Sequence, residues 1–338
     1  VNTKDHTVTL TVSGMSAIFN TLRLVRKIKP IGKIVVFGFP YLDTLKIMNR
    51  EEWNSEGCIF LGFGDNGDID KLTDLLKDSN STISAVFTEF PSNPLLNSHD
   101  LPRLSALAKE YDFILVVDDT ISSFANVNLI NSEGQVDVIC SSLTKVFSGI
   151  GDAMAGSMVI NPNSRYFESF RYILASNDLY IPPLANEDLI VLERNSREYI
   201  KRLYNTNANA LELANRLKSD SRVQNIYYPG INPNKDLYKS LLRSNDRCGY
   251  GCLLSFVLKD NTKIKLFYDS LLVNKGPSLG TEFTLVCPYT LLAHYNELDW
   301  AEQFGVSRHI VRLSVGEENI EDIWLRFNNA LDVISSTS

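Results

Sequence analysis

The stretch "CSSLTKVFSG" (140–149) follows the apolar run "VDVI" and ends it with hydroxyl side chains and a lysine. Lysine is rarely buried without a partner, so Lys145 is either an ordinary side chain whose charged end reaches water or an amine held for a purpose. The preceding apolar run ends in "VVDDT" (116–120), with two carboxylates. Because the carboxyl ends of adjacent strands line one crevice in an open α/β sheet, Asp118 and Lys145 can face a common ligand.

Around these two stretches, short apolar runs alternate with amphipathic stretches. Strands are predicted at 33–38, 58–63, 84–90, 113–119, 136–142 and 155–161. Helices are predicted at 16–28, 68–78 and 100–111. The last of these should begin with Asp100 as N-cap and Pro102 in its first turn. The alternation predicts an α/β fold with a mostly parallel sheet covered on both faces.

The second half of the chain has a different pattern. A long helical region is predicted over 186–220, after the break at Pro182 and Pro183. Strands at 251–259 and 309–316 and a helix at 320–334 follow. We therefore predict a large domain over residues 1–187 and a smaller α+β domain over residues 188–338.

Charge and hydropathy exclude two classes of partner. The 338 residues include 33 basic and 40 acidic side chains, a formal net charge of −7. Proteins that bind nucleic acid or an anionic membrane surface need dense basic clusters, and this sequence has none. Its apolar runs are also too short to span a bilayer. We expect no nucleic-acid partner and no membrane partner.

The five cysteines are scattered and odd in number. This favours a reducing compartment over a disulfide framework, so we expect a cytoplasmic protein. Cys248 and Cys252 have neither a second cysteine pair nor a histidine nearby in the sequence, so we expect no metal. The sequence starts without Met, and we expect a further segment upstream.

The loop "GFGDNG" (62–67) matches the G-x-G-x-x-G pattern of dinucleotide-binding folds. It follows a predicted strand and precedes a predicted helix. However, Asp65 and Asn66 stand where a pyrophosphate would approach, and Asp68 is expected to cap the helix, which places negative charge beside the anion site. We interpret the loop as a plain strand-to-helix turn. A nicotinamide dehydrogenase is the alternative.

A second constellation surrounds Lys145. The hydroxyls of Ser142 and Thr144 flank it, and "SGMSAIF" (13–19) places Ser-Gly-Met at a predicted helix start, where free amides and the helix dipole favour a phosphate. A lysine, an acid and a phosphate cradle are the parts of a pyridoxal 5'-phosphate (PLP) pocket. The lysine binds the cofactor, the acid pairs with the pyridinium nitrogen, and the hydroxyls and amides hold the phosphate.

The sequence resembles the PLP-dependent enzymes of cysteine and methionine metabolism, the family of cystathionine γ-synthases and lyases, over most of its length. "SGMSAI" resembles the family's S-G-M-A-A-I, "VVDDT" its V-V-D-N-T, and "SSLTK" its H-S-A-T-K. Further stretches resemble family motifs in the same order: "TEFPSNPLL" (88–96), "YYPGI" (227–231), "SLG" (278–280) and "VRLSVGEEN" (311–319). The order of seven motifs is more specific than any one of them.

The resemblance implies a fold-type I PLP-dependent transferase, which is an aspartate-aminotransferase-like architecture. Lys145 would bind the cofactor and carry protons, and Asp118 would pair with the ring nitrogen. Tyr41 would stack on the cofactor and take part in proton transfer. Other cofactor contacts are expected from Gly14, Met15, Glu89, Asn93, Thr120, Ser142 and Thr144. Substrate contacts are expected from Asn93, Ser278, Arg312 and Lys46.

Several positions depart from the family pattern. Pro277 stands where the family usually has an acid, Thr281 replaces a glycine, and Lys46 rather than arginine would meet the distal end of a substrate. The family's upstream Y-x-R segment, which reaches the neighbouring subunit's phosphate site, is not in this sequence. These departures bear on the choice of substrate more than on the cofactor.

The implied activity is γ-replacement of an O-acylhomoserine by cysteine, which forms cystathionine, with amino acids as substrates. The implied assembly is a homodimer or a dimer of dimers with active sites between subunits. One alternative is elimination on the same scaffold, by a cystathionine or methionine lyase. Another is a catalytically degenerate PLP-fold protein with a binding or regulatory role.

Overall fold

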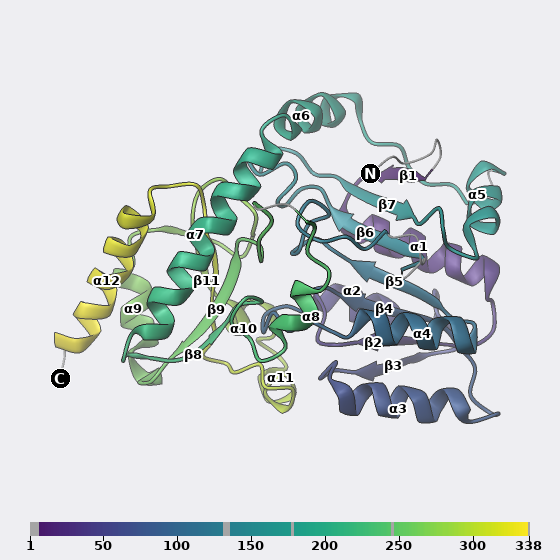
Figure 1. The fold of residues 1–338 in the computed structure, drawn as a ribbon, viewed down its shortest axis with the longest axis horizontal. Coiled ribbons are helices and arrows are strands. Elements are labelled where there is room, and N and C mark those ends of the chain that lie inside the picture. Colours follow the sequence, from purple (N-terminus) through teal and green to yellow (C-terminus); the bar gives the residue numbers. More distant parts are fainter. Residues whose placement is uncertain (1–6, 131–135, 177–178, 245–246, 337–338) are drawn as a thin grey trace.

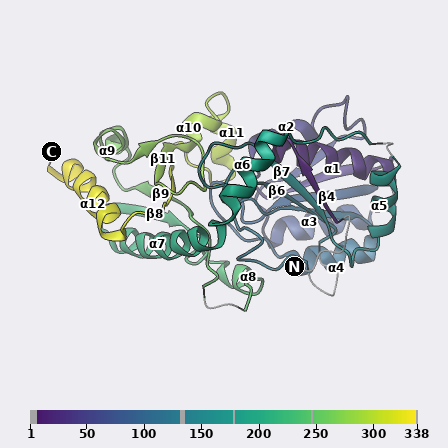
Figure 2. The ribbon, with the colours of Figure 1, turned by 90° about the horizontal axis from the view of Figure 1, so that it is seen from above.

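The computed structural model describes residues 7–130, 136–176, 179–244 and 247–336. Two β-sheets lie side by side along the long axis of the molecule (Figure 1). Viewed from above, α5 (Phe167–Ala175) lies at one end and α12 (Ile320–Ser336) at the other (Figure 2). In the sequence, the long helix α7 (Tyr199–Ser219) comes after the last strand of the first sheet and before the first strand of the second.

Seven strands of the described residues form the first sheet, in the order β1-β7-β6-β5-β4-β2-β3. The strands from β6 to β3 are parallel, whereas β7 is antiparallel to β6 and β1 is antiparallel to β7. Their bounds are Val8–Thr11, Lys33–Phe37, Cys58–Leu61, Ile83–Glu89, Ile114–Asp118, Val138–Ser142 and Gly156–Ile160 for β1 to β7. The predicted mostly parallel sheet is confirmed.

Helices cover both faces of this sheet, as predicted. Successive strand residues point to opposite faces, so Val36 packs with α1 (Gly14–Ile28) while Phe37 packs with α4 (Leu101–Tyr111). The remaining covering helices are α2 (Leu42–Met48) and α5 beside α1, and α3 (Asn66–Lys77) and α8 (Lys235–Lys239) beside α4. The parallel strands are therefore buried on both faces, which explains their near-continuous apolar runs.

Side chains at the helix starts confirm one prediction and correct another. Asp100 caps α4 by accepting a hydrogen bond from the amide of Arg103 at 3.0 Å, with proline in the first turn. The prediction that Asp68 caps α3 is wrong, because the cap is Asp65, whose carboxylate accepts from the Asp68 amide. Asp68 lies in the first turn of the helix and is buried. Both residues are common caps, and the sequence pattern did not separate them.

The helical region expected over 186–220 divides into two helices, α6 (Asn186–Ser196) and α7. Only Arg197 and Glu198 separate them, and neither is a helix breaker, so the division left no mark in the sequence. The predicted domain boundary between residues 187 and 188 lies inside α6, and it stays a prediction.

Five strands of the described residues form the second sheet, in the order β10-β11-β12-β9-β8. Helix α7 packs on one face with α9 and α12, and α10 and α11 lie toward the first sheet with Phe39 and Leu95. The strand bounds for β8 to β12 are Val223–Tyr227, Leu253–Leu258, Asn274–Lys275, Leu285–Pro288 and Val311–Ser314. The helices are α9 (Ile264–Ser270), α10 (Tyr289–Ala293) and α11 (Leu298–Gln303), with a 3₁₀ turn at Asn261–Lys263.

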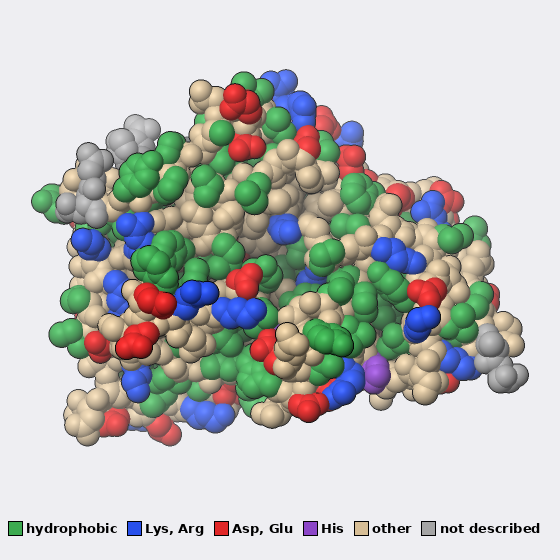
Figure 3. Space-filling view, turned by 180° about the vertical axis from the view of Figure 1, so that it is seen from behind, with side chains coloured by type: hydrophobic (Ala, Val, Ile, Leu, Met, Phe, Trp, Pro, Cys, Tyr) green, Lys and Arg blue, Asp and Glu red, His purple; other side chains and the backbone are tan. Residues whose placement is uncertain are grey.

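Acidic and basic side chains are interspersed on the face shown in Figure 3, without a broad field of one sign. Within the described ranges, no helix combines the length and apolar character that crossing a membrane requires.

Candidate active site

Lys145 lies three residues beyond β6, in a turn where its amide donates to the carbonyl of Ser142 at 3.2 Å. Its Nζ donates to Ser278 Oγ, across the seam between the two sheets, at 2.9 Å. Burial, and secondly the charge of Arg312, lower the pKa of Lys145. A lowered pKa favours the neutral amine, which is the form that acts as nucleophile or base.

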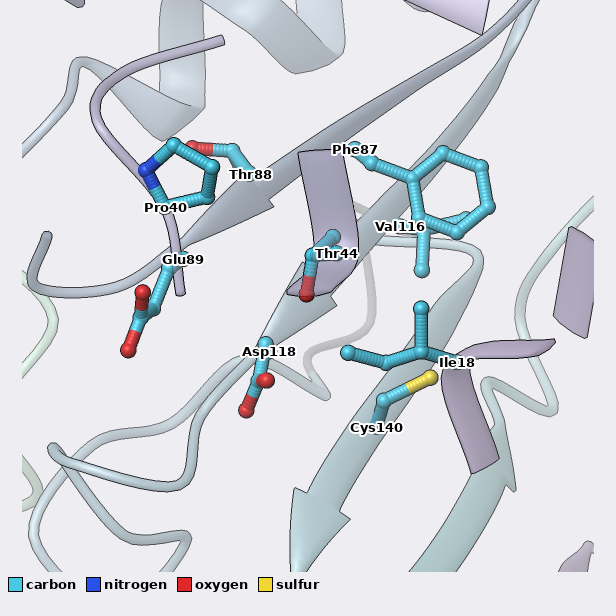
Figure 4. A pocket seen from close by; sticks show the side chains of 9 residues that line it. All are labelled: Ile18, Pro40, Thr44, Phe87, Thr88, Glu89, Val116, Asp118 and Cys140. Carbon is cyan, nitrogen blue, oxygen red and sulfur yellow. The ribbon is translucent and has the colours of Figure 1, made fainter. Parts of the chain in front are cut away.

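Two carboxyl groups lie side by side at the ends of neighbouring strands. Glu89 is the register partner of Asp118 in the β4–β5 pair, and both side chains line a small pocket with Thr44 and Cys140 (Figure 4). Asp118 Oδ1 accepts from the Thr120 amide at 3.0 Å. Among the described residues, no lysine, arginine or histidine forms an ion pair with either carboxyl group.

The surroundings of these two groups disfavour their charged forms. Burial raises the pKa of Asp118, against hydrogen bonds from Thr120 that lower it. Burial also raises the pKa of Glu89 well above its usual value, and the neighbouring Asp118 raises it further. A cationic ring nitrogen placed beside Asp118 would remove this penalty, because an opposite charge nearby favours the carboxylate.

The start of α1 adjoins the end of β6. Ser13 caps the helix by accepting from the Ser16 amide at 3.1 Å. A Cβ added to Gly14 would lie 2.6 Å from the Cβ of Ser142, so only glycine permits this approach. Ser142 in turn donates its amide to Thr120 Oγ1 at 2.7 Å. The structure thus brings the helix start together with Ser142, which was predicted to bind phosphate, and with Thr120, which was predicted to contact the cofactor.

Thr144, the third of these hydroxyl residues, is engaged locally. Its Oγ1 donates to the carbonyl of Ala155 at 3.2 Å and accepts from the Ala155 amide at 3.0 Å. The side chain therefore ties the turn before Lys145 to the start of β7. Any phosphate contact by Thr144 must share its hydroxyl with these bonds.

Tyr41 and Lys46 lie at the rim of the site. The Tyr41 amide donates to Glu89 Oε2 at 2.7 Å, and its side chain is 43% exposed. Burial, followed by Asp43, raises the pKa of the Tyr41 phenol. Lys46 lies on α2, with its Nζ 3.7 Å from Asp43 Oδ1 and its side chain 58% exposed. Such an exposed pair holds the ammonium group loosely, so it remains accessible to another anion.

Arg312, on β12, is buried beside Asn93. Its Nη1 donates to Asn93 Oδ1 at 3.1 Å, and its Nη2 donates to the carbonyl of Pro277. Tyr289, which sequence reasoning missed, completes this cluster: its Oη accepts from Asn93 Nδ2 at 3.0 Å and its ring lies against the guanidinium. A tyrosine at the end of an apolar run looks like core in a sequence, which is why no signal marked it.

Asp119 follows Asp118 but points to the opposite face of the sheet. There its carboxyl accepts from the Ser141 hydroxyl, and its other oxygen has no hydrogen-bond partner among the described residues. Burial raises the pKa of Asp119 to about 7. The two adjacent carboxyl groups therefore belong to different environments, and only Asp118 faces Glu89.

The glycine-rich loop binds its own helix instead of a nucleotide. The buried Asp68 carboxylate accepts from the amides of Phe63 and Gly64 at 2.8 and 2.9 Å, so it occupies the donors that a pyrophosphate would need. This supports the interpretation as a plain turn. In the described part of the chain, no group of three or more His, Cys, Asp or Glu side chains is placed to hold a metal ion.

The residues present fit PLP. Three features converge at the carboxyl ends of β4, β5 and β6: an amine of lowered pKa, a half-buried carboxyl that forms no ion pair among the described residues, and a glycine helix start beside serine and threonine hydroxyls. The first two match a covalent attachment point and a partner for the ring nitrogen. The third matches a phosphate cradle.

The family model "Cys/Met metabolism PLP-dependent enzyme" matches residues 3–332. The chain therefore belongs to this family of PLP-dependent enzymes, and the predicted fold class and cofactor are confirmed. A crystal structure of cystathionine γ-synthase from Xanthomonas oryzae superposes with a TM-score of 0.84 over 98% of this chain and 82% of that one, at 24% identity. This likeness shows the fold.

Two fungal relatives carry the same name. Cystathionine γ-synthase of Neurospora crassa is 43% identical over all of this chain and 54% of that protein. Cystathionine γ-synthase of Saccharomyces cerevisiae is 39% identical over 95% of this chain and 52% of that protein. The chain thus spans about half the length of these curated relatives.

Proposed function

We propose that the protein replaces the acyloxy group at Cγ of an O-acylhomoserine by the sulfur of L-cysteine, giving cystathionine and the free acid. The single observation that carries this proposal is the placement of the Lys145 amine beside Ser278, where burial, and secondly the charge of Arg312, lower its pKa. The names of the two fungal relatives support the choice of reaction.

In this proposal, Lys145 binds the cofactor covalently and Asp118 pairs with the ring nitrogen. Tyr41 lies against the ring, and Glu89 holds the Tyr41 backbone in place. The phosphate is held by Gly14, Met15, Thr120, Ser142 and Thr144. The substrate is held by Asn93, Ser278, Arg312 and Lys46.

When bound, PLP supplies an electron sink that stabilises negative charge at the substrate Cα. The Lys145 amine would move protons between the substrate Cα, Cβ and the leaving group. Arg312 binds the α-carboxylate with its planar donors, a task that suits a guanidinium better than an ammonium. The Lys46 ammonium meets the distal end of the acyl group or of the incoming cysteine.

The test has two stages and uses the full-length protein. Borohydride reduction followed by peptide mapping should place a pyridoxyl group on Lys145. Incubation with O-succinylhomoserine or O-acetylhomoserine plus L-cysteine should then give cystathionine by mass spectrometry. An unlabelled protein, or one labelled at another lysine, contradicts the cofactor assignment. A labelled protein that forms no cystathionine contradicts the reaction.

The alternatives give different products. A lyase converts L-cystathionine and water to cysteine, 2-oxobutanoate and ammonia in the absence of an acylhomoserine. A degenerate scaffold gives neither reaction whether or not it binds the cofactor. Two incubations, one of an O-acylhomoserine with L-cysteine and one of L-cystathionine alone, therefore distinguish a synthase, a cystathionine lyase and a degenerate scaffold.

For the assembly, we propose a homodimer or dimer of dimers with active sites at the interface. Support comes from an apolar groove of about 540 Å³ beside β1, β6 and β7, on the face opposite α1. Val8, Leu10, Phe124 and Ile200 line it and are each between 38% and 47% exposed. Sedimentation equilibrium should show at least a dimer.

For the location, we propose the cytoplasm. The five cysteines form no disulfide, which supports this proposal.

A further inference from the structure

Tyr289 is the first residue of α10 and directly follows β11. It is 4% exposed, and it contacts two of the four side chains expected to meet the substrate. Its hydroxyl accepts from Asn93 Nδ2, and its ring centroid lies 4.2 Å from the guanidinium carbon of Arg312. Tyr289 therefore contacts both Asn93 and Arg312, although the sequence analysis did not predict it as a site residue.

The three side chains form a closed set of contacts. Arg312 Nη1 donates to Asn93 Oδ1, so the two ends of the Asn93 amide are assigned different partners. Because a guanidinium can only donate, the Asn93 oxygen must face Arg312. The Tyr289 hydroxyl then accepts from the nitrogen end and holds the amide in that position.

Arg312 is a buried cation that donates to two neutral acceptors, Asn93 Oδ1 and the Pro277 carbonyl. It is 3% exposed, and no described carboxylate forms an ion pair with it. The Tyr289 ring offsets part of the cost of burying this charge, because a cation over an aromatic face is attracted by the ring quadrupole. The ring also covers one face of the guanidinium. An incoming carboxylate must then approach along the guanidinium edge, which is the geometry of a bidentate pair.

We infer that Tyr289 is the positioning residue that makes the site selective for α-carboxylates, by holding Arg312 and Asn93 in one relative orientation. The inference rests on the proposed binding of the substrate carboxylate by Arg312. It predicts that a change at Tyr289 lowers the affinity for a ligand with a carboxylate at Cα more than the affinity for the same ligand with hydrogen in its place. It does not require that Tyr289 touch the substrate.

Two variants separate the contributions of the ring and the hydroxyl. Tyr289→Phe keeps the ring under Arg312 and removes the acceptor for Asn93, whereas Tyr289→Leu removes both. The matched control is Tyr228→Phe, because Tyr228 is a buried tyrosine of the same sheet region whose hydroxyl donates to the Gly251 carbonyl at 2.9 Å. Thermal unfolding of each variant without cofactor shows whether the fold is retained.

Calorimetry on the full-length protein with PLP bound then measures two probes. L-2-Aminobutyrate has an α-carboxylate and no γ leaving group, and 1-propylamine is the same molecule without the carboxylate. In Tyr289→Leu, we expect affinity for L-2-aminobutyrate to fall about tenfold or more while affinity for 1-propylamine is unchanged. In Tyr289→Phe, the fall should be smaller, about threefold. Tyr228→Phe should change neither affinity.

Equal losses for both probes, or no loss for either, overturn the inference. If Tyr289→Leu fails to fold, Tyr289→Phe decides the question with the same pair of probes. The outcome is separable from that of the proposed reaction. A protein that makes no cystathionine but loses carboxylate selectivity in the Tyr289 variants contradicts the reaction and leaves this role of Tyr289 standing.

Discussion

The Lys145 amine and the Ser278 hydroxyl form a hydrogen bond across the seam between the two sheets, at an Nζ–Oγ distance of 2.9 Å. The two residues are far apart in the sequence and come from separate sheet regions. Their contact fixes the reactive amine relative to the segment that also carries Pro277, whose carbonyl accepts from Arg312. The amine and the guanidinium therefore share one backbone support.

Ser278→Ala removes the hydroxyl that accepts from Lys145. A hydrogen bond between neutral groups contributes about 0.5–1.5 kcal/mol, so we expect kcat/KM to fall by about two- to tenfold. Steady-state kinetics on the reaction with L-cysteine measure the change. Ser335→Ala, on the last helix, is the control and should be close to wild type. An unchanged kcat/KM in Ser278→Ala would show that this bond has no part in turnover.

Asp118→Asn should separate function from stability. Asp118 is half-buried and has no ion-pair partner among the described residues, and its raised pKa means that desolvation penalises its charge. We expect the cofactor-free variant to be at least as stable as wild type in urea unfolding, while kcat falls about a hundredfold or more because the ring nitrogen loses its anionic partner. Loss of stability together with near-normal activity would contradict this assignment.

Gly14→Ala tests the phosphate cradle. The new Cβ would lie 2.6 Å from the Ser142 Cβ, so either the helix start or the serine must move. We expect affinity for PLP, measured by fluorescence titration of the cofactor-free protein, to fall about tenfold or more. Gly67→Ala, in the first turn of α3, is the matched control, since its Cβ would meet only the flexible Asp65 carboxylate. Equal affinities in the two variants would place the phosphate elsewhere.

Lys46→Ala tests the distal end of the substrate. If the Lys46 ammonium meets the free carboxylate of a succinyl group, KM for O-succinylhomoserine should rise about three- to tenfold, and KM for O-acetylhomoserine should not change. Arg50→Ala removes a neighbouring charge from the same helix end and serves as the control. A parallel rise in both KM values would indicate a general effect on the site.

Asp119→Asn should change how stability depends on pH. Burial raises the folded-state pKa of Asp119 to about 7, and the unfolded value is about 3.9. The folded state thus keeps a proton that the unfolded state releases, so this group's contribution to stability is complete below about pH 4 and is lost as the pH rises toward 7. The variant should lose this slope, at most about 1.4 kcal/mol per pH unit.

Urea unfolding of Asp119→Asn and wild type at several pH values between about 5 and 8 measures the difference. Asp70→Asn, at a side chain 68% exposed on α3, is the control and should run parallel to wild type. If wild type and Asp119→Asn also run parallel, the carboxyl of Asp119 is not protonated in the folded state.

The first sheet was largely predictable because its strands are apolar on both faces and its helices carry clear caps such as Asp100. Strands β1 and β8 were not predicted: they expose polar or edge residues, and only their pairing with β7 and β9 defines them. The division between α6 and α7 carries no helix breaker. In these places tertiary contacts, which a local pattern does not report, decide the structure.

For the site, motif order located Lys145 and Asp118, which the structure places at the ends of adjacent strands. Tyr289 was missed because its role comes from contacts with residues on other elements, Asn93 and Arg312. The N-cap of α3 was predicted at Asp68 instead of Asp65, because both aspartates lie near the helix start. Chemistry that depends on a motif is therefore easier to read from the sequence than the side chains that orient it.

Gly280 comes so close to the backbone of Val146 that a Cβ there would clash, and its amide donates to Ser314 Oγ at 2.7 Å. The second sheet thus supplies Ser278, Tyr289 and Arg312 through one seam, while the first supplies Lys145 and Asp118. The protein is in this respect modular. A chimaera joined within α6, with the later half taken from a relative of different activity, should still bind PLP if the glycine at the seam is retained. It should take the donor's contacts at positions 278 and 312 and keep this protein's Asn93 and Lys46.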